Sequence, residues 1–121
     1  MTDKITLVLG ASLNPQRYSY LAVNRLLQTG HRVVAIGSKE GKIEDVKIET
    51  GFPEFSDIHT VTIYLSIKNQ KQFYDYIIAL KPKRIIFNPG AENSELNELA
   101  VKNNIETMEA CTLVLLATGE Y

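Results

Sequence analysis

Short apolar runs alternate with amphipathic segments along this chain of 121 residues. The apolar runs, several of them rich in β-branched residues, predict five strands, at residues 6–9, 31–36, 61–65, 84–87 and 105–108. The amphipathic segments predict helices at residues 18–28, 68–80 and 94–103, and a last short helix at 113–117. Turn residues support these boundaries, since Gly30 follows the first helix and Pro82 follows the second.

Strands and helices that alternate in this way are typical of βαβ units and a parallel sheet. We expect an α/β fold: a Rossmann-like, doubly wound three-layer sandwich, with a five-stranded parallel sheet in the order 3-2-1-4-5 and helices on both faces. Residues 39–55 have no such pattern and are predicted to be irregular, apart from a short extended piece around 45–48. The length predicts one domain over residues 1–121.

In this strand order, the arrangement reverses between the first and the fourth strand. Ligands of doubly wound sheets bind at the carboxyl ends of the strands beside such a reversal. The turns at 10–12 and 88–90 would meet there, and residues 37–39 would border the same crevice. Because the turn at 10–12 leads to a helix N-terminus, its backbone N–H groups and the helix dipole favour a phosphate.

The residues around this crevice narrow the choice of ligand. Of the three glycines in a dinucleotide fingerprint only Gly10 is present, and the second strand ends in Ser38 and Lys39 instead of an acid. Serine and lysine suit a 3′-phosphate (coenzyme A) or a 2′-phosphate (NADP) better than the bare diol of NAD, although a solvated turn would look the same. The positive charge of Arg17 is unfavourable near the positive N-terminus of a helix unless an anion lies between the two. The alternative interpretation is that Arg17 lies on an ordinary solvent-exposed face.

Composition and charge exclude several classes of protein. A formal net charge of −1 provides no basic excess for nucleic acid. The apolar runs are too short to span a membrane, and residues 1–5 do not read as a signal peptide. Cys111 is the only cysteine and has no internal disulfide partner, so we expect a cytoplasmic location.

The sequence shows no recognisable combination of catalytic or metal-binding residues. His31 and His59 have no ligand partners at metal spacing, and neither Ser12 nor Ser19 has a nearby histidine to activate it. Cys111 is the exception. It precedes the last predicted helix, and a cysteine at a helix N-terminus has a lowered pKa that favours the reactive thiolate. It could form a mixed disulfide with coenzyme A, or it could be a small buried apolar residue.

Residues 10–20, Gly-Ala-Ser-Leu-Asn-Pro-Gln-Arg-Tyr-Ser-Tyr, carry a family resemblance. They resemble the Gly-Ala-Ser-x-x-Pro-x-Arg-x-Ser turn of the small stand-alone coenzyme A-binding proteins, whose Rossmann-like domain is related to the coenzyme A-binding part of succinyl-CoA synthetase. The resemblance covers the whole chain and includes residues 87–90, Glu92 and Cys111. This chain differs from the family in two places. After the second strand it has Gly-Ser-Lys at 37–39 where the family usually has Asn-Pro, and near the fourth strand it has Phe-Asn-Pro-Gly at 87–90 where the family usually has aromatic-x-Gln-x-Gly. The family's adenine and phosphopantetheine contacts therefore apply to this chain less directly than those of the first turn.

The resemblance implies a set of ligand-binding residues in three groups. On the pyrophosphate side, the candidates are Gly10, Ala11, Ser12, Asn14, Pro15, Arg17, Ser19 and Tyr20. Beside the adenosine they are Gly37, Ser38 and Lys39, and along the rest of the cleft Leu65, Ser66, Pro89, Gly90 and Cys111.

The expected function is therefore non-catalytic binding of coenzyme A or an acyl-CoA, by a carrier, a sensor or a subunit of a larger enzyme. A homodimer is conceivable. One alternative is an enzyme, either an NADP-dependent reductase or an acyl-CoA-processing protein that uses Cys111. The other is a protein-interaction module that kept the fold and lost the ligand.

Overall fold

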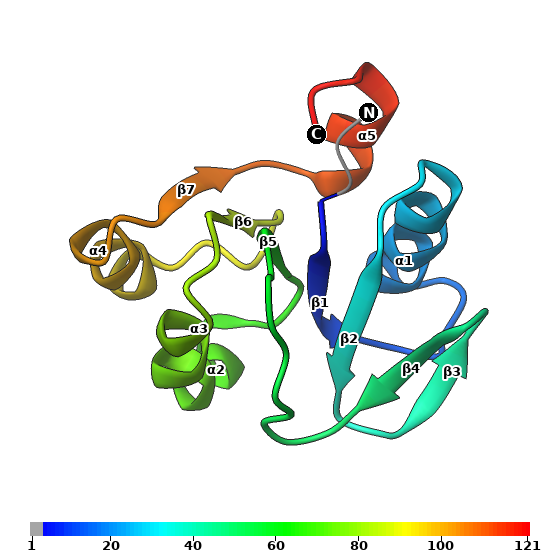
Figure 1. Cartoon of the computed structure of the whole chain (residues 1–121), viewed down its shortest axis with the longest axis horizontal. Coiled ribbons are helices and arrows are strands. Elements are labelled where there is room, and N and C mark those ends of the chain that lie inside the picture. Colours follow the sequence, from blue (N-terminus) through cyan, green and yellow to red (C-terminus); the bar gives the residue numbers. More distant parts are fainter. Residues whose placement is uncertain (1–3) are drawn as a thin grey trace.

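The computed structural model describes residues 4–121, which form an α/β fold with helices on both faces of one sheet (Figure 1). The strands are β1 (Thr6–Ala11), β2 (Val33–Gly37), β3 (Gly41–Ile43), β4 (Val46–Glu49), β5 (Thr60–Ile63), β6 (Arg84–Phe87) and β7 (Glu106–Glu109). The helical segments are α1 (Tyr18–Gln28), α2 (Ile67–Gln70), the 3-10 turn η1 (Lys71–Phe73), α3 (Tyr74–Leu80), α4 (Ser94–Lys102) and α5 (Thr112–Thr118). The Rossmann-like class predicted from the sequence is confirmed.

The predicted number and order of the strands were wrong. In the described part of the chain the sheet has 7 strands in the order β3-β4-β2-β1-β5-β6-β7. The strand predicted at 61–65 is β5, and it pairs with β1 instead of β2. β4 occupies the place beside β2, and β3 is antiparallel to β4. The order therefore reverses between β1 and β5, so the turn after β5 lies next to the turn after β1.

The additional strands β3 and β4 form a hairpin inside the segment predicted to be irregular. Ile43, Val46 and Ile48 are buried, whereas Lys42 and Lys47 between them are exposed. This alternation spans too few residues to be recognised beside the surrounding charges. The hairpin turn is Glu44-Asp45, with φ of 51° at Glu44, and it carries none of the Asn-Gly or Asp-Gly signals of such turns.

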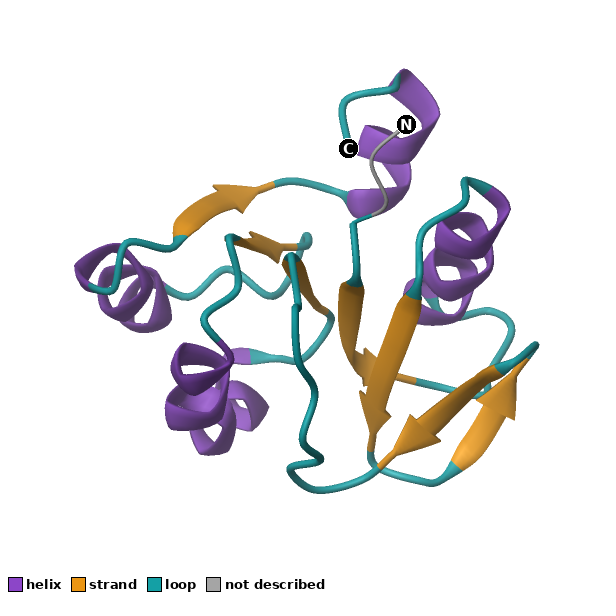
Figure 2. Ribbon diagram, viewed as in Figure 1, coloured by secondary structure: helices purple, strands orange, loops and turns teal. Residues whose placement is uncertain are grey.

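Two hydrophobic cores lie on the two faces of the sheet, because successive side chains of a strand point to opposite faces. Leu7 and Leu9 of β1 belong to the same core as Ile77 of α3. Val8 belongs to the other core, together with Val23 of α1. Figure 2 shows the helices divided accordingly between the two sides of the strands. β1 is buried on both faces and lies in the middle of the strand order.

The single helix predicted at 68–80 is divided into α2, η1 and α3. Gln70 and Phe73 are both buried, at a spacing of three residues that matches a 3-10 turn. Ile77 follows Phe73 at the spacing of an α-helix. Gln70, the last residue of α2, thus places a polar side chain in the interior beside the apolar ones.

At the amino end of the sheet, opposite the turns discussed above, Arg84 is buried in a cluster of polar groups. Its Nε donates a hydrogen bond to Thr60 Oγ1 at 2.8 Å, and its guanidinium lies 4.4 Å from the centre of the Tyr121 ring. The Tyr121 hydroxyl shares a hydrogen bond with Thr6 Oγ1 at 2.5 Å. The ends of the described chain are therefore tied together across this edge.

His59 borders this cluster, and its environment is expected to make the stability of the protein depend on pH. Burial lowers the pKa of His59 below its ordinary value of 6.5; the charges of Arg84, Lys4 and Lys83 lower it further, whereas Glu106 raises it. Between these two pKa values the unfolded chain binds a proton that the folded protein does not. We therefore expect the free energy of unfolding to fall as the pH decreases below about 6.5, until the folded pKa is reached.

Urea unfolding at about pH 7.5 and about pH 5 measures this effect, and His59→Gln should give a flatter dependence than the native chain. Equal pH dependence in both proteins would show that other groups are responsible.

Candidate functional site

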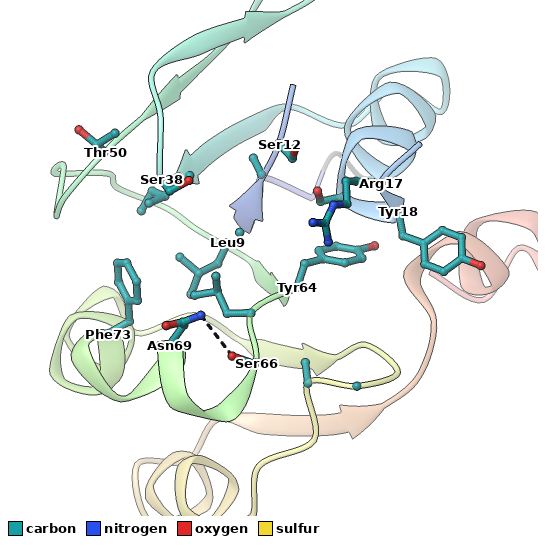
Figure 3. A pocket seen from close by; sticks show the side chains of 18 of the residues that line it. Leu9, Ser12, Arg17, Tyr18, Ser38, Thr50, Tyr64, Ser66, Asn69 and Phe73 are labelled. Carbon is teal, nitrogen blue, oxygen red and sulfur yellow. Dashed lines mark hydrogen bonds between the residues drawn. The ribbon is translucent and has the colours of Figure 1, made fainter. Parts of the chain in front are cut away.

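A cavity of about 910 Å³ opens at the carboxyl ends of the central strands. Its walls come from the β1–α1 turn, the ends of β2 and β4, the β5–α2 turn and the β6–α4 loop (Figure 3). This is the crevice that doubly wound sheets use for ligands, and its volume lies within the range of ligand pockets. The reversal between β1 and β5 brings these segments together.

Most of the residues predicted to form the site line this cavity. They are Gly10, Ala11, Ser12, Arg17, Ser19, Gly37, Ser38, Leu65, Ser66, Pro89 and Gly90. Asn14, Pro15, Tyr20, Lys39 and Cys111 do not line it.

The β1–α1 turn is built by its own short polar side chains. Ser12 Oγ accepts a hydrogen bond from the Asn14 N–H at 3.1 Å, and Asn14 Oδ1 accepts one from the Gln16 N–H at 3.0 Å. The Asn14 carbonyl accepts from the Arg17 N–H at 3.0 Å. Asn14 therefore shapes the turn from outside the cavity, as asparagine commonly does in such turns.

Among the described residues, the N-terminus of α1 has neither a capping side chain at its N-cap position nor an acidic residue in its first turn. Arg17 is the N-cap residue, but its side chain makes no capping hydrogen bond, and the first turn contains no acidic residue. Helix N-termini normally attract such acceptors or acids. Their absence from this described helix leaves its positive end available to an external anion.

Arg17 also supplies the charge of the cavity. It is the only charged side chain among the described residues that line it. In Figure 3 its guanidinium points toward the Tyr64 ring, while Tyr18 points away from the cavity. A cation beside a helix N-terminus, with no carboxylate among the described residues of the wall, favours an anionic ligand.

Two glycines allow the turns to approach one another. Gly10 has φ of +99°, and a Cβ there would lie 3.1 Å from the Tyr64 carbonyl carbon. A Cβ on Gly37 would lie 2.4 Å from the Ala11 carbonyl oxygen. The ends of β1, β2 and β5 are thus too close together for a side chain at either position.

Gly37→Ala is expected to lower the free energy of unfolding by about 1–3 kcal/mol, because the backbone of Ala11 has to move away from the added methyl group. Urea unfolding measures the change. Ser38→Ala, at the exposed neighbouring position, should stay within about 0.5 kcal/mol of the native value. Equal stability of Gly37→Ala and Ser38→Ala would show that the close approach carries no energetic cost.

On the opposite wall, a buried amide side chain joins two loops. Gln70 Nε2 donates hydrogen bonds to the carbonyl oxygens of Leu65 and Ala91, each at 2.8 Å. Asn93 Nδ2 donates to Gln70 Oε1 at 2.9 Å, and Asn93 Oδ1 accepts from the Leu96 N–H at the start of α4. Gln70 therefore holds the β5–α2 turn against the β6–α4 loop. The sequence shows no signal for this role.

Asn88, at the end of β6, has its side chain turned into the protein. Its Nδ2 donates to Thr62 Oγ1 at 2.7 Å and to the Ile63 carbonyl at 3.0 Å, and its Oδ1 accepts from the Thr112 N–H at 2.9 Å. It thereby fixes the start of α5. Cys111 is the partly exposed residue that precedes α5.

Tyr64 contributes a neutral wall to the cavity. Burial raises the pKa of Tyr64 to about 12, an effect that the nearby Thr112 and Thr62 hydroxyls partly oppose. Its hydroxyl is therefore expected to stay protonated at neutral pH.

Several lining residues escaped the sequence analysis. They are Leu9, Gln16, Tyr18, Ile36, Thr50, Gly51, Phe52, Tyr64, Asn69, Gln72, Phe73 and Ala91. Residues 50–52 follow the carboxyl end of β4, where ligands of parallel sheets bind, so recognition of β4 as a parallel strand would have predicted them as site residues. The residues from α2 and η1 follow from the position of β5 beside β1, which was predicted incorrectly.

No histidine, cysteine or carboxylate is found among the described side chains that line the cavity. Within residues 4–121 no group of three or more histidine, cysteine, aspartate and glutamate side chains could hold a metal ion. No helix in the described part of the chain has both the length and the apolar character needed to cross a bilayer.

Comparison with protein families yields a model described as a CoA binding domain, which matches residues 4–117. Among curated proteins none matches this chain.

Several solved structures share the fold. A crystal structure of an uncharacterized protein is 44% identical, with 100% of each chain covered and a TM-score of 0.96. A hypothetical protein from Pyrococcus horikoshii OT3 is 22% identical over 93% of this chain and 80% of its own, with a TM-score of 0.81. A dinucleotide forming acetyl-coenzyme A synthetase 1 from Ca. Korarchaeum cryptofilum, solved in complex with phosphate and ADP, has 19% identity and a TM-score of 0.68. That match covers 88% of this chain and 25% of the synthetase. At such identities the last two show the fold alone.

Proposed function

The chain belongs to the CoA-binding domain family, and on this premise we propose that it binds coenzyme A or an acyl-CoA in the cavity and does not itself catalyse a reaction. The observation that carries the proposal is the pairing of Arg17 with the uncapped N-terminus of α1, both at the cavity. The pyrophosphate of coenzyme A would lie there, held by backbone N–H groups and the guanidinium.

The remaining walls fit the other parts of this ligand. Leu9, Ile36 and Leu65 provide apolar surface for the base and the pantetheine chain. Ser38 lines the cavity at the end of β2, and the exposed Lys39 follows it. A lysine side chain is long enough to reach a 3′-phosphate beside Ser38. These residues hold and orient the ligand, which would itself supply the thiol that carries an acyl group.

The composition of the walls supports binding without catalysis. Tyr64 is neutral at physiological pH, and Cys111 lies outside the cavity lining. The protein would then act as a carrier or a sensor of coenzyme A, or as a subunit that presents it to a larger enzyme.

Calorimetric titration with coenzyme A, 3′-dephospho-coenzyme A and NADP tests the proposal. Saturable binding of coenzyme A that weakens without the 3′-phosphate would support it and would place that phosphate near Ser38 and Lys39. A preference for NADP would favour a reductase. Absence of binding by any coenzyme A species, acyl-CoA included, would overturn the proposal.

A further inference from the structure

Phe52 is an apolar ring that is exposed on the wall of the cavity. Its side chain is 55% exposed, although it lies in the cavity lining next to Thr50 and Gly51. Ile67 and Val101 are similarly exposed but lie outside the cavity. An exposed aromatic ring in a ligand cavity offers apolar surface against which a planar group can pack.

Phe52 is held in place by other aromatic side chains. Its ring centre lies 5.3 Å from that of Phe73 and 5.6 Å from that of Tyr76, in tilted and edge-on arrangements. The Tyr76 hydroxyl donates a hydrogen bond to the carbonyl of Pro53, the next residue, at 2.6 Å. Burial raises the pKa of Tyr76 to about 12, so this donor is retained at neutral pH. The loop after β4 is therefore anchored with the ring already positioned.

The location of this aromatic wall distinguishes the two ends of the cavity. Arg17 lies near the middle strand, β1. From there the cavity extends in one direction past Ser38, which follows β2, to Thr50 and Phe52, which follow β4. Figure 3 shows Phe73 pointing into the cavity, across from Ser38 and Thr50. The other end runs past Tyr64 to Pro89 and Gly90. A planar base suits the end with two phenylalanine rings, and a flexible chain suits the end at the loop.

We propose that Phe52, supported by Phe73, is the stacking surface for the adenine ring of the ligand and thereby orients it, with the pantetheine chain toward Pro89. This inference rests on the proposed function. Stacking of a base on an aromatic side chain is favourable for any base, so Phe52 provides affinity and orientation, while hydrogen bonds at the Ser38 end would provide selection.

The experiment separates the two halves of the ligand. Calorimetry compares Phe52→Ala with the native chain for coenzyme A, adenosine 3′,5′-bisphosphate and 4′-phosphopantetheine. We expect Phe52→Ala to weaken the first two about 5- to 150-fold and to leave 4′-phosphopantetheine within about twofold. Phe52→Tyr, which keeps the ring, should retain the native affinity. Val101→Ala, at an equally exposed apolar position on α4, is the matched control and should change nothing.

A second measurement keeps an aromatic ring at position 52. The chain has no tryptophan, so Phe52→Trp introduces a single indole. Its fluorescence should be quenched when adenosine 3′,5′-bisphosphate or coenzyme A binds. The inference is overturned if the native chain binds coenzyme A but Phe52→Ala binds it equally well and the indole emission is unchanged. It is also overturned if Phe52→Ala weakens both halves of the ligand equally. A native chain that binds no coenzyme A species would instead refute the proposed function.

Discussion

Arg17→Ala is expected to weaken coenzyme A binding by about 1.5–3 kcal/mol, or roughly 10- to 150-fold. In the proposed complex, the pyrophosphate would lose a charge-assisted hydrogen bond from Arg17, the only charged side chain among the described residues that line the cavity. Arg17→Lys should lie between the two proteins, because a lysine keeps the charge but not the bidentate geometry. Calorimetric titration of the three proteins measures these differences.

Arg25→Ala provides the control, because Arg25 is an exposed arginine in the last turn of the same helix and does not line the cavity. Its substitution should leave the affinity for coenzyme A unchanged. Arg17 is exposed, so the stability of Arg17→Ala without ligand should be close to that of the native chain. An Arg17→Ala protein with native affinity would place the pyrophosphate elsewhere.

Gln70→Met is expected to lower the free energy of unfolding by about 2–5 kcal/mol. Methionine has a similar volume but cannot donate to the carbonyl oxygens of Leu65 and Ala91, which would be left without this donor in the interior. Asn93 would also lose its acceptor, Gln70 Oε1. Urea unfolding monitored by circular dichroism measures the change.

The matched control is Gln28→Met, at an exposed glutamine that ends α1, where the change should remain within about 0.5 kcal/mol. Because Leu65 and Ala91 also line the cavity, Gln70→Met should weaken coenzyme A binding as well. A loss of stability below about 1 kcal/mol would mean that other donors replace Gln70.

The sequence by itself determined most of the elements and the local structure of the first turn. Both depend on neighbours in the chain. The apolar run before Gly10 forms β1, and α1 begins at Tyr18 and is followed by Gly30, which has φ of +87°. A strand, a turn and a helix N-terminus are local structures, so the position of Arg17 beside that turn could also be predicted from spacing.

The tertiary structure alone decided which strands are neighbours. The β3–β4 hairpin has only a few alternating residues and an unusual Glu44-Asp45 turn, so the sequence does not indicate it, and the strand predicted at 61–65 then takes the place beside β2 that β4 occupies in the structure. Pairing of β5 with β1 depends on contacts between residues more than fifty positions apart. Local pattern does not contain that information.

The same reason explains the residues of the site that the sequence did not reveal. Phe52 belongs to the cavity only because β4 pairs with β2, and Gln70 is a structural residue only because the loops after β5 and β6 meet above it. Their side chains are unremarkable in sequence, since an exposed phenylalanine or a helical glutamine has no characteristic spacing. Long-range strand pairing creates their environments, and their roles follow from those environments.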